Sequence, residues 1–186
     1  MANPTSGWNA NSDLIVGNDL WLYLVDLGFG SSAVPMTYSS ATGSSAEALA
    51  YATSCNFEMN ADTLEGASKM SCRFSVSRAG QGSYNVTADA LYCVQANAAA
   101  NNCKTVDDLF EAFIKGANVG WVMAVDKSRD AQQCGTVLGP DPTYPIYWGE
   151  ASIASLSING GNNEICSTSI SLTGSGAPHK GNDESE

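Results

Sequence analysis

The stretch YWGEASIASLSINGGNNEICSTSISL, residues 147–172, decides the fold. In the second half serines alternate with apolar residues, which is the period of a β-strand that has one covered face. Between the halves lies the run NGGNN, residues 159–163, a composition typical of the turn between two paired strands. Residues 147–158 and 164–172 are therefore predicted to form an antiparallel hairpin.

Further strands are predicted on the N-terminal side of this hairpin. Residues 50–62 alternate in the same way and predict a half-buried antiparallel strand. Residues 19–26 and 119–125 are apolar on both faces, which predicts strands buried on two sides. Residues 63–82 are polar and rich in turn formers, and they fit either a long loop or an extended β-hairpin.

One helix is predicted over residues 105–115. Thr105 and Asp108 have the spacing of a capping box, and Gly116 can supply the left-handed residue that ends a helix. Its apolar residues recur at helical spacing and predict one buried stripe. They are Val106, Leu109, Phe110, Phe113 and Ile114.

Because strands come in runs rather than alternating with helices, the predicted class is mainly β. We expect a β-sandwich or open β-barrel of about six to eight strands with one packed helix at about 105–115. The predicted organisation is an N-terminal arm over residues 1–13, a single β domain over 14–176 and a flexible acidic tail over 177–186. Residues 28–45 are expected to form a long exposed connection.

The charge pattern argues against a nucleic-acid-binding protein and favours assembly. The 186 residues carry 8 basic and 19 acidic side chains, a net charge of −11, and only 15% of residues are charged. Gripping nucleic acid needs a basic stripe, which an acidic chain lacks. Residues 1–68 hold no Lys or Arg, so positive charge is segregated along the chain. A head-to-tail assembly could use such segregation, and chance clustering accounts for it equally well.

No motif for catalysis, metal binding or membrane insertion is found. A single histidine, His179, argues against Ser-His or Cys-His catalysis, and the sequence predicts no enzyme, no cofactor and no metal. The first ten residues lack the basic and apolar regions of a signal peptide. We therefore expect the six cysteines to be reduced and mostly buried, with disulfide formation left open.

The order of these segments resembles that of the major tail proteins, or tail tube proteins, of tailed bacteriophages. The resemblance covers residues 14–176 and rests on order and spacing rather than on one diagnostic motif. The cysteines and the 126–145 loop lie outside the pattern. The matching segments, besides the helix, are GNDL at 17–20, CNFEMN at 55–60 with ASK at 67–69, YNVTADAL at 84–91, YWGEASI at 147–153 and SISLTGSG at 169–176.

The resemblance implies a structural virion protein, a subunit of hexameric rings that stack into the hollow tail tube through which DNA is ejected. It implies tape measure, tail terminator and possibly sheath proteins as partners, transient non-specific passage of DNA, and no membrane insertion. It also implies assembly in the cytoplasm of the bacterial host and a final place in the virion tail. Sheets of neighbouring subunits would join edge to edge, with the helix outside.

Site residues follow from the alternation combined with this resemblance. A channel wall without cations would let DNA phosphates pass. The residues expected to face the channel are Ser54, Asn56, Glu58, Asn60, Glu150, Ser167, Ser169 and Ser171. The residues expected to contact the next ring are Lys69, Arg73 and Arg78.

Two other classes of protein stay open at this stage. One is another assembling β protein, such as a tube of the type VI secretion kind, a pilus or a capsid-decoration protein. The second is a carbohydrate-binding β-sandwich. The last would need exposed aromatic residues on one face, whereas most tryptophans lie within apolar runs.

Overall fold

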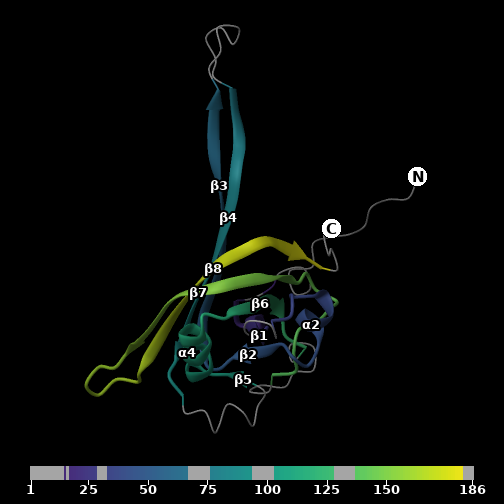
Figure 1. Ribbon diagram of the computed structural model, residues 1–186. Helices are drawn as coiled ribbons and strands as arrows, with labels where there is room; N and C mark the ends of the chain where they lie inside the picture. The colour runs from purple at the N-terminus through teal and green to yellow at the C-terminus, as the bar shows by residue number, and fades with distance from the viewer. Residues whose placement is uncertain are drawn as a thin grey trace, which may run out of the picture.

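The computed structural model describes residues 15, 17–28, 33–66, 76–93, 103–127 and 137–181. Figure 1 shows their arrangement, in which β3 and β4 extend together far beyond the rest of the sheet. The elements are η1 Gly17–Asp19, β1 Leu20–Asp26, α2 Tyr38–Thr42, β2 Glu47–Leu49, β3 Ala52–Gly66, β4 Val76–Leu91, β5 Cys103–Lys104, α4 Val106–Lys115, β6 Asn118–Val125, β7 Tyr147–Asn159 and β8 Ser167–Lys180.

The described strands form one eight-stranded sheet in the order β3-β4-β8-β7-β6-β1-β2-β5. Neighbouring strands are antiparallel, except that the short strands β2 and β5 run parallel. The predicted class, mainly β with one packed helix at 105–115, is confirmed. The predicted hairpin is also present as β7 and β8, and residues 63–66 and 76–82 form paired strands rather than a loop.

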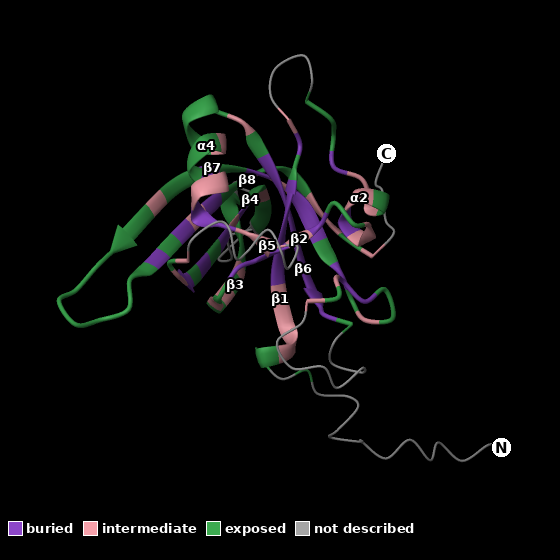
Figure 2. Ribbon diagram, turned by 90° about the horizontal axis from the view of Figure 1, so that it is seen from below, coloured by how far each residue is buried: buried purple, intermediate pink, exposed green. Residues whose placement is uncertain are grey.

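The main core lies between the two halves of this sheet. Val86 from β4 and Leu172 from β8 share one cluster with Leu22 from β1 and Trp121 from β6, so the two halves face each other. Figure 2 shows the buried residues along these strands. A buried cluster that draws on both halves closes the sheet over a common core and explains why strands far apart in sequence pack together.

A second core cluster covers the opposite face of β1 and β6. Tyr23 and Val122 lie in it, together with Trp148 at the start of β7. This confirms that residues 19–26 and 119–125 are buried on both sides. The cluster is closed by Met36 and Ala41, so residues 33–45 are not the exposed connection predicted from their composition. Tyr38 and Ala46 also pack on this cluster, and a capping box of Thr37 and Ser40 begins the short helix α2.

The C-terminal strand is longer than its pattern predicts. Strand β8 continues to Lys180, past residue 177 where the flexible tail was expected to begin. The ring of His179 stacks on Trp148 with 4.3 Å between ring centroids. This aromatic contact anchors a segment that is otherwise polar. The cysteines also depart from the expectation of mostly buried thiols. Of the four in the described residues, Cys55, Cys93 and Cys103 are half-buried and Cys166 is exposed.

Helix α4 has the predicted caps. The backbone N–H and the hydroxyl of Thr105 donate to the Asp108 carboxylate at 2.9 and 2.8 Å. Gly116 adopts φ 64° and ends the helix. The predicted stripe is only half buried, because Val106 and Leu109 pack on the sheet while Phe110, Phe113 and Ile114 are exposed.

The buried hydroxyl of Tyr23 predicts a loss of stability in alkali. Burial, and then the hydrogen bond and charge of Asp126, raise the pKa of Tyr23 far above its usual value of 10.0. The unfolded chain therefore loses this proton above about pH 10 while the folded chain keeps it. The stabilisation by this buried hydroxyl is complete below about pH 10. As the pH rises above about 10, the free energy of unfolding should fall by about 1.4 kcal/mol per pH unit.

Urea unfolding at pH 9 to 11.5 measures this slope. The variant Tyr23→Phe should show a shallower slope, less steep by about 1.4 kcal/mol per pH unit, since it has no proton to lose. Equal slopes for the two proteins would contradict the prediction.

Candidate functional site: a polar sheet face

The outer face of the sheet segment β3-β4-β8-β7 is covered with small polar side chains. Strand register arranges them in rows that cross all four strands. The first row is Ser54, Asp89, Ser169 and Ser157, the second is Asn56, Thr87, Ser171 and Ser155, and the third is Glu58, Asn85, Thr173 and Ser152. The rows contain no Lys or Arg, and their charges are those of Asp89 and Glu58.

Simple alternation produces this face. In β4, Val86, Ala88 and Ala90 point into the main core, so Thr87 and Asp89 between them point outward. In β8, the buried Ile170 and Leu172 leave the serines on the other side by the same rule. Because four neighbouring strands have the same alternation, their polar side chains form one continuous surface.

Asp89 is the centre of the most ordered part of this surface. Its carboxylate accepts hydrogen bonds from Ser54 Oγ at 2.8 Å and Ser169 Oγ at 2.7 Å, so it ties three strands together. Hydrogen bonds from Ser169 and from Ser54 lower the pKa of the Asp89 carboxyl. The face therefore keeps a negative charge at neutral and mildly acidic pH.

The structure brings most of the predicted channel residues together on this face. These residues are Ser54, Asn56, Glu58 and Asn60 on β3, and Ser167, Ser169 and Ser171 on β8. Sequence reasoning missed the contribution of β4, including Asp89. The signal was present in the alternation of residues 84–91, which was used only as part of a family pattern. It also missed the serines of β7, because a register shift after Ile153 breaks the period there.

Glu150 lies apart from the other predicted channel residues. It is half-buried, and its Oε1 accepts a hydrogen bond from the backbone N–H of Met36 at 2.9 Å. It pairs in register with Ser175, beyond the third row. Of the residues predicted to contact the next ring, Arg78 is exposed on β4, in the part that pairs with β3 but not with β8. Lys69 and Arg73 lie outside the described residues.

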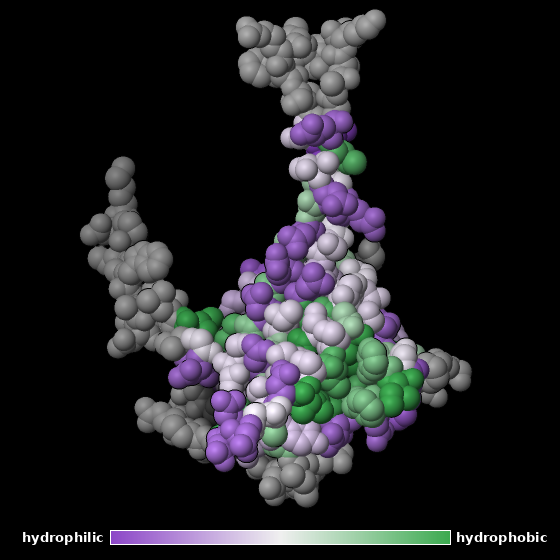
Figure 3. Space-filling model, turned by 90° about the vertical axis from the view of Figure 1, so that its left-hand side faces the viewer, coloured by the Kyte–Doolittle hydropathy of each residue, from purple (hydrophilic) through white to green (hydrophobic). Residues whose placement is uncertain are grey.

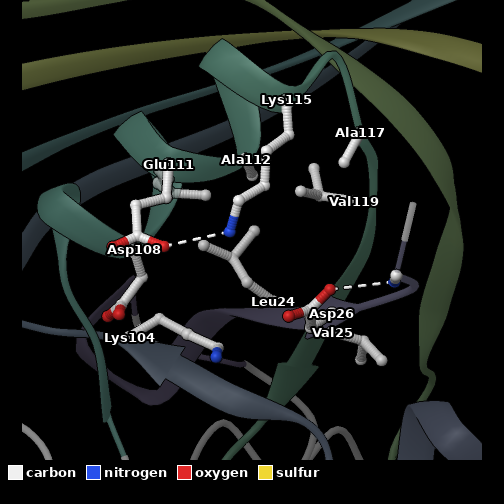
Figure 4. Close-up of a pocket in the computed structure, with 12 residues that line it drawn as sticks. Leu24, Val25, Asp26, Lys104, Asp108, Glu111, Ala112, Lys115, Ala117 and Val119 are labelled. Atoms are coloured by element: carbon white, nitrogen blue, oxygen red, sulfur yellow. Dashed lines mark hydrogen bonds and ion pairs between the residues drawn. The ribbon is translucent and has the colours of Figure 1, made fainter. Parts of the chain in front are cut away.

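A cavity of about 230 Å³ between α4 and β1 is the other candidate site. Figure 4 shows the Lys115 ammonium in this cavity, reaching toward Glu111. That ion pair measures 3.1 Å, and Lys104 pairs with Glu47 at 3.1 Å. Asp108 accepts the hydrogen bonds of the helix cap, and Asp26 accepts the backbone N–H of Gly28 at 2.9 Å, so each charged side chain around the cavity already has a partner.

The described residues contain no cluster of His, Cys, Asp and Glu that could hold a metal ion. Within the same part of the chain, no helix is long and apolar enough to cross a membrane.

No protein-family model matches the sequence, and no curated protein sequence is similar to it. Solved structures do match. The SPP1 tail tube protein has 15% identity and a TM-score of 0.59, over 90% of this chain and 79% of that one. A chain from the tail of an empty gene transfer agent particle, determined with C6 symmetry, has 16% identity and a TM-score of 0.57. The match covers 89% of this chain and 98% of that one.

A third match is the baseplate of the anti-feeding prophage, in a structure with sixfold symmetry. Its identity is 6% and its TM-score 0.53, over 92% of this chain and 99% of that one. At such identities the likeness concerns the fold. The chain has the fold of tail tube proteins, as the resemblance in sequence order predicts.

Proposed function

We propose that this chain, which has the tail tube fold, is a structural subunit of a hollow tube made of stacked hexameric rings. The polar sheet face carries this proposal. It is continuous over four strands and holds no cation, and it belongs to a chain whose structural neighbours include assembled tails. A wall of hydroxyls and carboxylates does not bind the phosphates of passing DNA.

The free edges of the sheet support a ring. No described strand pairs with the outer edge of β3. Strand β7 pairs with β6 from Tyr147 to Ser152, and the rest of β7 has no described partner on that side. Four antiparallel strands place β3 and β7 in opposite directions. In a ring of copies related by rotation, β7 of one copy therefore meets β3 of the next as an antiparallel pair, which covers the free edges of these two strands.

In this arrangement the polar face lines the channel. The proposed channel residues are Ser54, Asn56, Glu58, Asn60, Ser167, Ser169 and Ser171, with Thr87 and Asp89 added from β4 and Glu150 toward one end. The long β3–β4 hairpin carries Arg78 away from the body of the molecule (Figure 1) and would reach the next ring. Lys69 and Arg73, nearer its tip in sequence, are proposed for the same contact.

The remaining parts of the proposal follow from the tube. The tube domain runs from residue 14 to Lys180, the end of β8. The arm over residues 1–13 and the tail after Lys180 are proposed from the sequence, since residues 1–13 and 182–186 lie outside the described part of the chain. The tube is built in the bacterial cytoplasm, ends in the virion tail and meets the tape measure and terminator proteins, and a sheath protein where the tail has one. The chain acts without catalysis.

Electron microscopy of the purified protein, concentrated at near-physiological salt, tests the assembly. Hollow tubes or sixfold rings are expected, and a cryo-EM map should place the serine rows on the channel side. A map with these side chains on the outside would overturn the assignment of the channel face. A protein that stays monomeric even with preformed tube ends as nuclei would overturn the proposed function.

Placing lysines on the channel face should make the tube hold DNA. The variant Asn56→Lys/Ser171→Lys adds two cations to the second row, and its tubes should retain linear duplex DNA about tenfold more than wild-type tubes, less so at high salt. Closed circular DNA, which has no end to enter a channel, should not be retained. Gel shift with labelled DNA of both forms measures this.

The control places the same charges elsewhere. Ser39→Lys/Ser44→Lys changes two exposed serines in and after α2, on the side of the second core cluster. Its tubes should treat linear and circular DNA alike. If the channel-face variant also binds both forms equally, residues Asn56 and Ser171 do not line a channel.

A further inference from the structure

Helix α4 exposes a large apolar surface. Phe110, Phe113 and Ile114 are 52%, 48% and 68% exposed, and Ile158 and Ile165 of the β7–β8 hairpin are 53% and 75% exposed. We call these five residues the α4 patch. Figure 3 looks onto the side of the molecule that carries α4 and this hairpin, and it shows apolar residues gathered there. Contiguous apolar surface of this kind marks a contact site.

The α4 patch is continuous with the main core. Leu109 on the same helix is buried in the main cluster, and Ala112 and Leu156 are half-buried against it. In β7, Leu156 and Ile158 share one face, which is opposite to that of the serine rows. The patch is thus an outward extension of the core face of the sheet, and its natural cover is another apolar sheet face.

The patch also lies beside a free strand edge. Helix α4 packs against β7, and the stretch of β7 after Ser152 pairs with β8 alone among the described strands. A strand added to this edge of β7 would run directly alongside the helix. Its side chains on the core side would face Phe113 and Ile114.

Strand β3 of a second copy has the required properties. It is an edge strand of the same sheet, and its direction is opposite to that of β7. Its core-side face carries Phe57, which packs on its own core, and then Met59, which is 63% exposed. Met59 is a large flexible apolar side chain with no cover in the single chain, and Met adapts well to irregular apolar surfaces.

We propose that the α4 patch is the docking surface for β3 of the next copy, with Met59 seated against Phe113 and Ile114. This inference rests on the proposed ring and names the side chains that hold it together. Each copy would use both surfaces once, so one contact repeated by rotation closes the ring. The exposed half of the helix stripe is then buried in the assembly.

Charge substitutions at the two ends of this contact test it. Ile114→Glu and Met59→Glu should each lower the pelletable tube fraction by at least about tenfold, since a buried carboxylate faces an apolar surface. Val34→Glu is the matched control, because Val34 is also 63% exposed but lies outside the patch, and it should assemble as the wild type does. Circular dichroism melts of each monomer check folding.

A compensating pair identifies the partner strand. Met59→Lys combined with Ile114→Glu should recover a substantial part of the tube fraction, because the two charges then meet across the contact. Normal assembly of Ile114→Glu would overturn the docking proposal and leave the tube proposal intact. Loss in both single variants without recovery in the pair would show that another surface covers the patch. Wild-type protein that never forms tubes would overturn the proposed function itself.

Discussion

Replacing Gly174 with alanine should lower the free energy of unfolding by about 3 kcal/mol, the upper end of the usual cost of overpacking. Gly174 lies in β8 against the ring of Tyr84, and a Cβ at this position would overlap the ring atoms. The ring has little freedom to withdraw. Its hydroxyl donates to the carbonyl of Glu150 and receives the Trp121 Nε1–H at 3.4 Å.

The neighbours of Tyr84 make this overlap costly. The Trp121 ring lies 5.6 Å from the Tyr84 ring between centroids, and Phe57 lies 4.9 Å from Trp121. Gly149 closes the other side, where a Cβ would come within 2.9 Å of the Tyr84 hydroxyl. Any shift of the ring therefore moves the centre of the main core or breaks a hydrogen bond.

Urea unfolding of Gly174→Ala against the wild type measures the effect. Gly82→Ala is the matched control, because Gly82 is also in a strand but its added Cβ would meet only an Asn60 carbonyl at 3.8 Å. That variant should be neutral or slightly more stable. Equal unfolding midpoints for Gly174→Ala and wild type would show that the aromatic cluster can rearrange.

Replacing Asp126 with alanine should cost about 3 kcal/mol of stability through the loss of buried hydrogen bonds. Asp126 is 1% exposed and Tyr23 is fully buried. The carboxylate accepts the Tyr23 hydroxyl at 2.5 Å and the backbone N–H of Gly139 at 2.9 Å. It also accepts the N–H of Leu138 at 3.2 Å, so it fixes the segment after residue 136 to the end of β6.

The second variant in this series is Asp126→Ala with Tyr23→Phe. Removing both partners leaves no stranded hydroxyl, so the double variant should be more stable than the sum of the two single changes predicts. Thermal unfolding of the four proteins gives the coupling. If the loss of stability in the double variant equals the sum of the two single losses, water replaces the carboxylate as the partner of Tyr23 in Asp126→Ala.

Local patterns predicted those elements whose burial is decided by their own residues. The two-sided strands β1 and β6 have continuous apolar runs, and the capped helix α4 and the strand β8 have periodic sequences. The short parallel pair β2 and β5 could not be predicted, because each strand is only two or three residues long and exists through its partner. Helix α2 was missed for the same reason, since Met36 and Ala41 gain their burial from β6 and its neighbours.

The polar face was predictable in part. Alternation along β3 and β8 marks their outward residues, whichever strands lie between them. That Asp89 stands between Ser54 and Ser169 depends on β4 pairing with both strands, a register set by long-range contacts. Periodicity could not predict that Phe110, Phe113 and Ile114 are exposed. The helical pattern indicates an apolar stripe, but it does not indicate whether the same chain or another copy covers that stripe.

The carboxylate of Asp89 gives the proposed channel an electrical property. Hydroxyl donors on two sides hold it ionised, so every ring would carry a belt of fixed negative charge at the height of this residue. Such a belt attracts small cations and excludes small anions, as rings of carboxylates do in ion channels. The empty tube would then conduct as a cation-selective pore. Single-tube conductance under a salt gradient should show a reversal potential of the cation sign, reduced in Asp89→Asn.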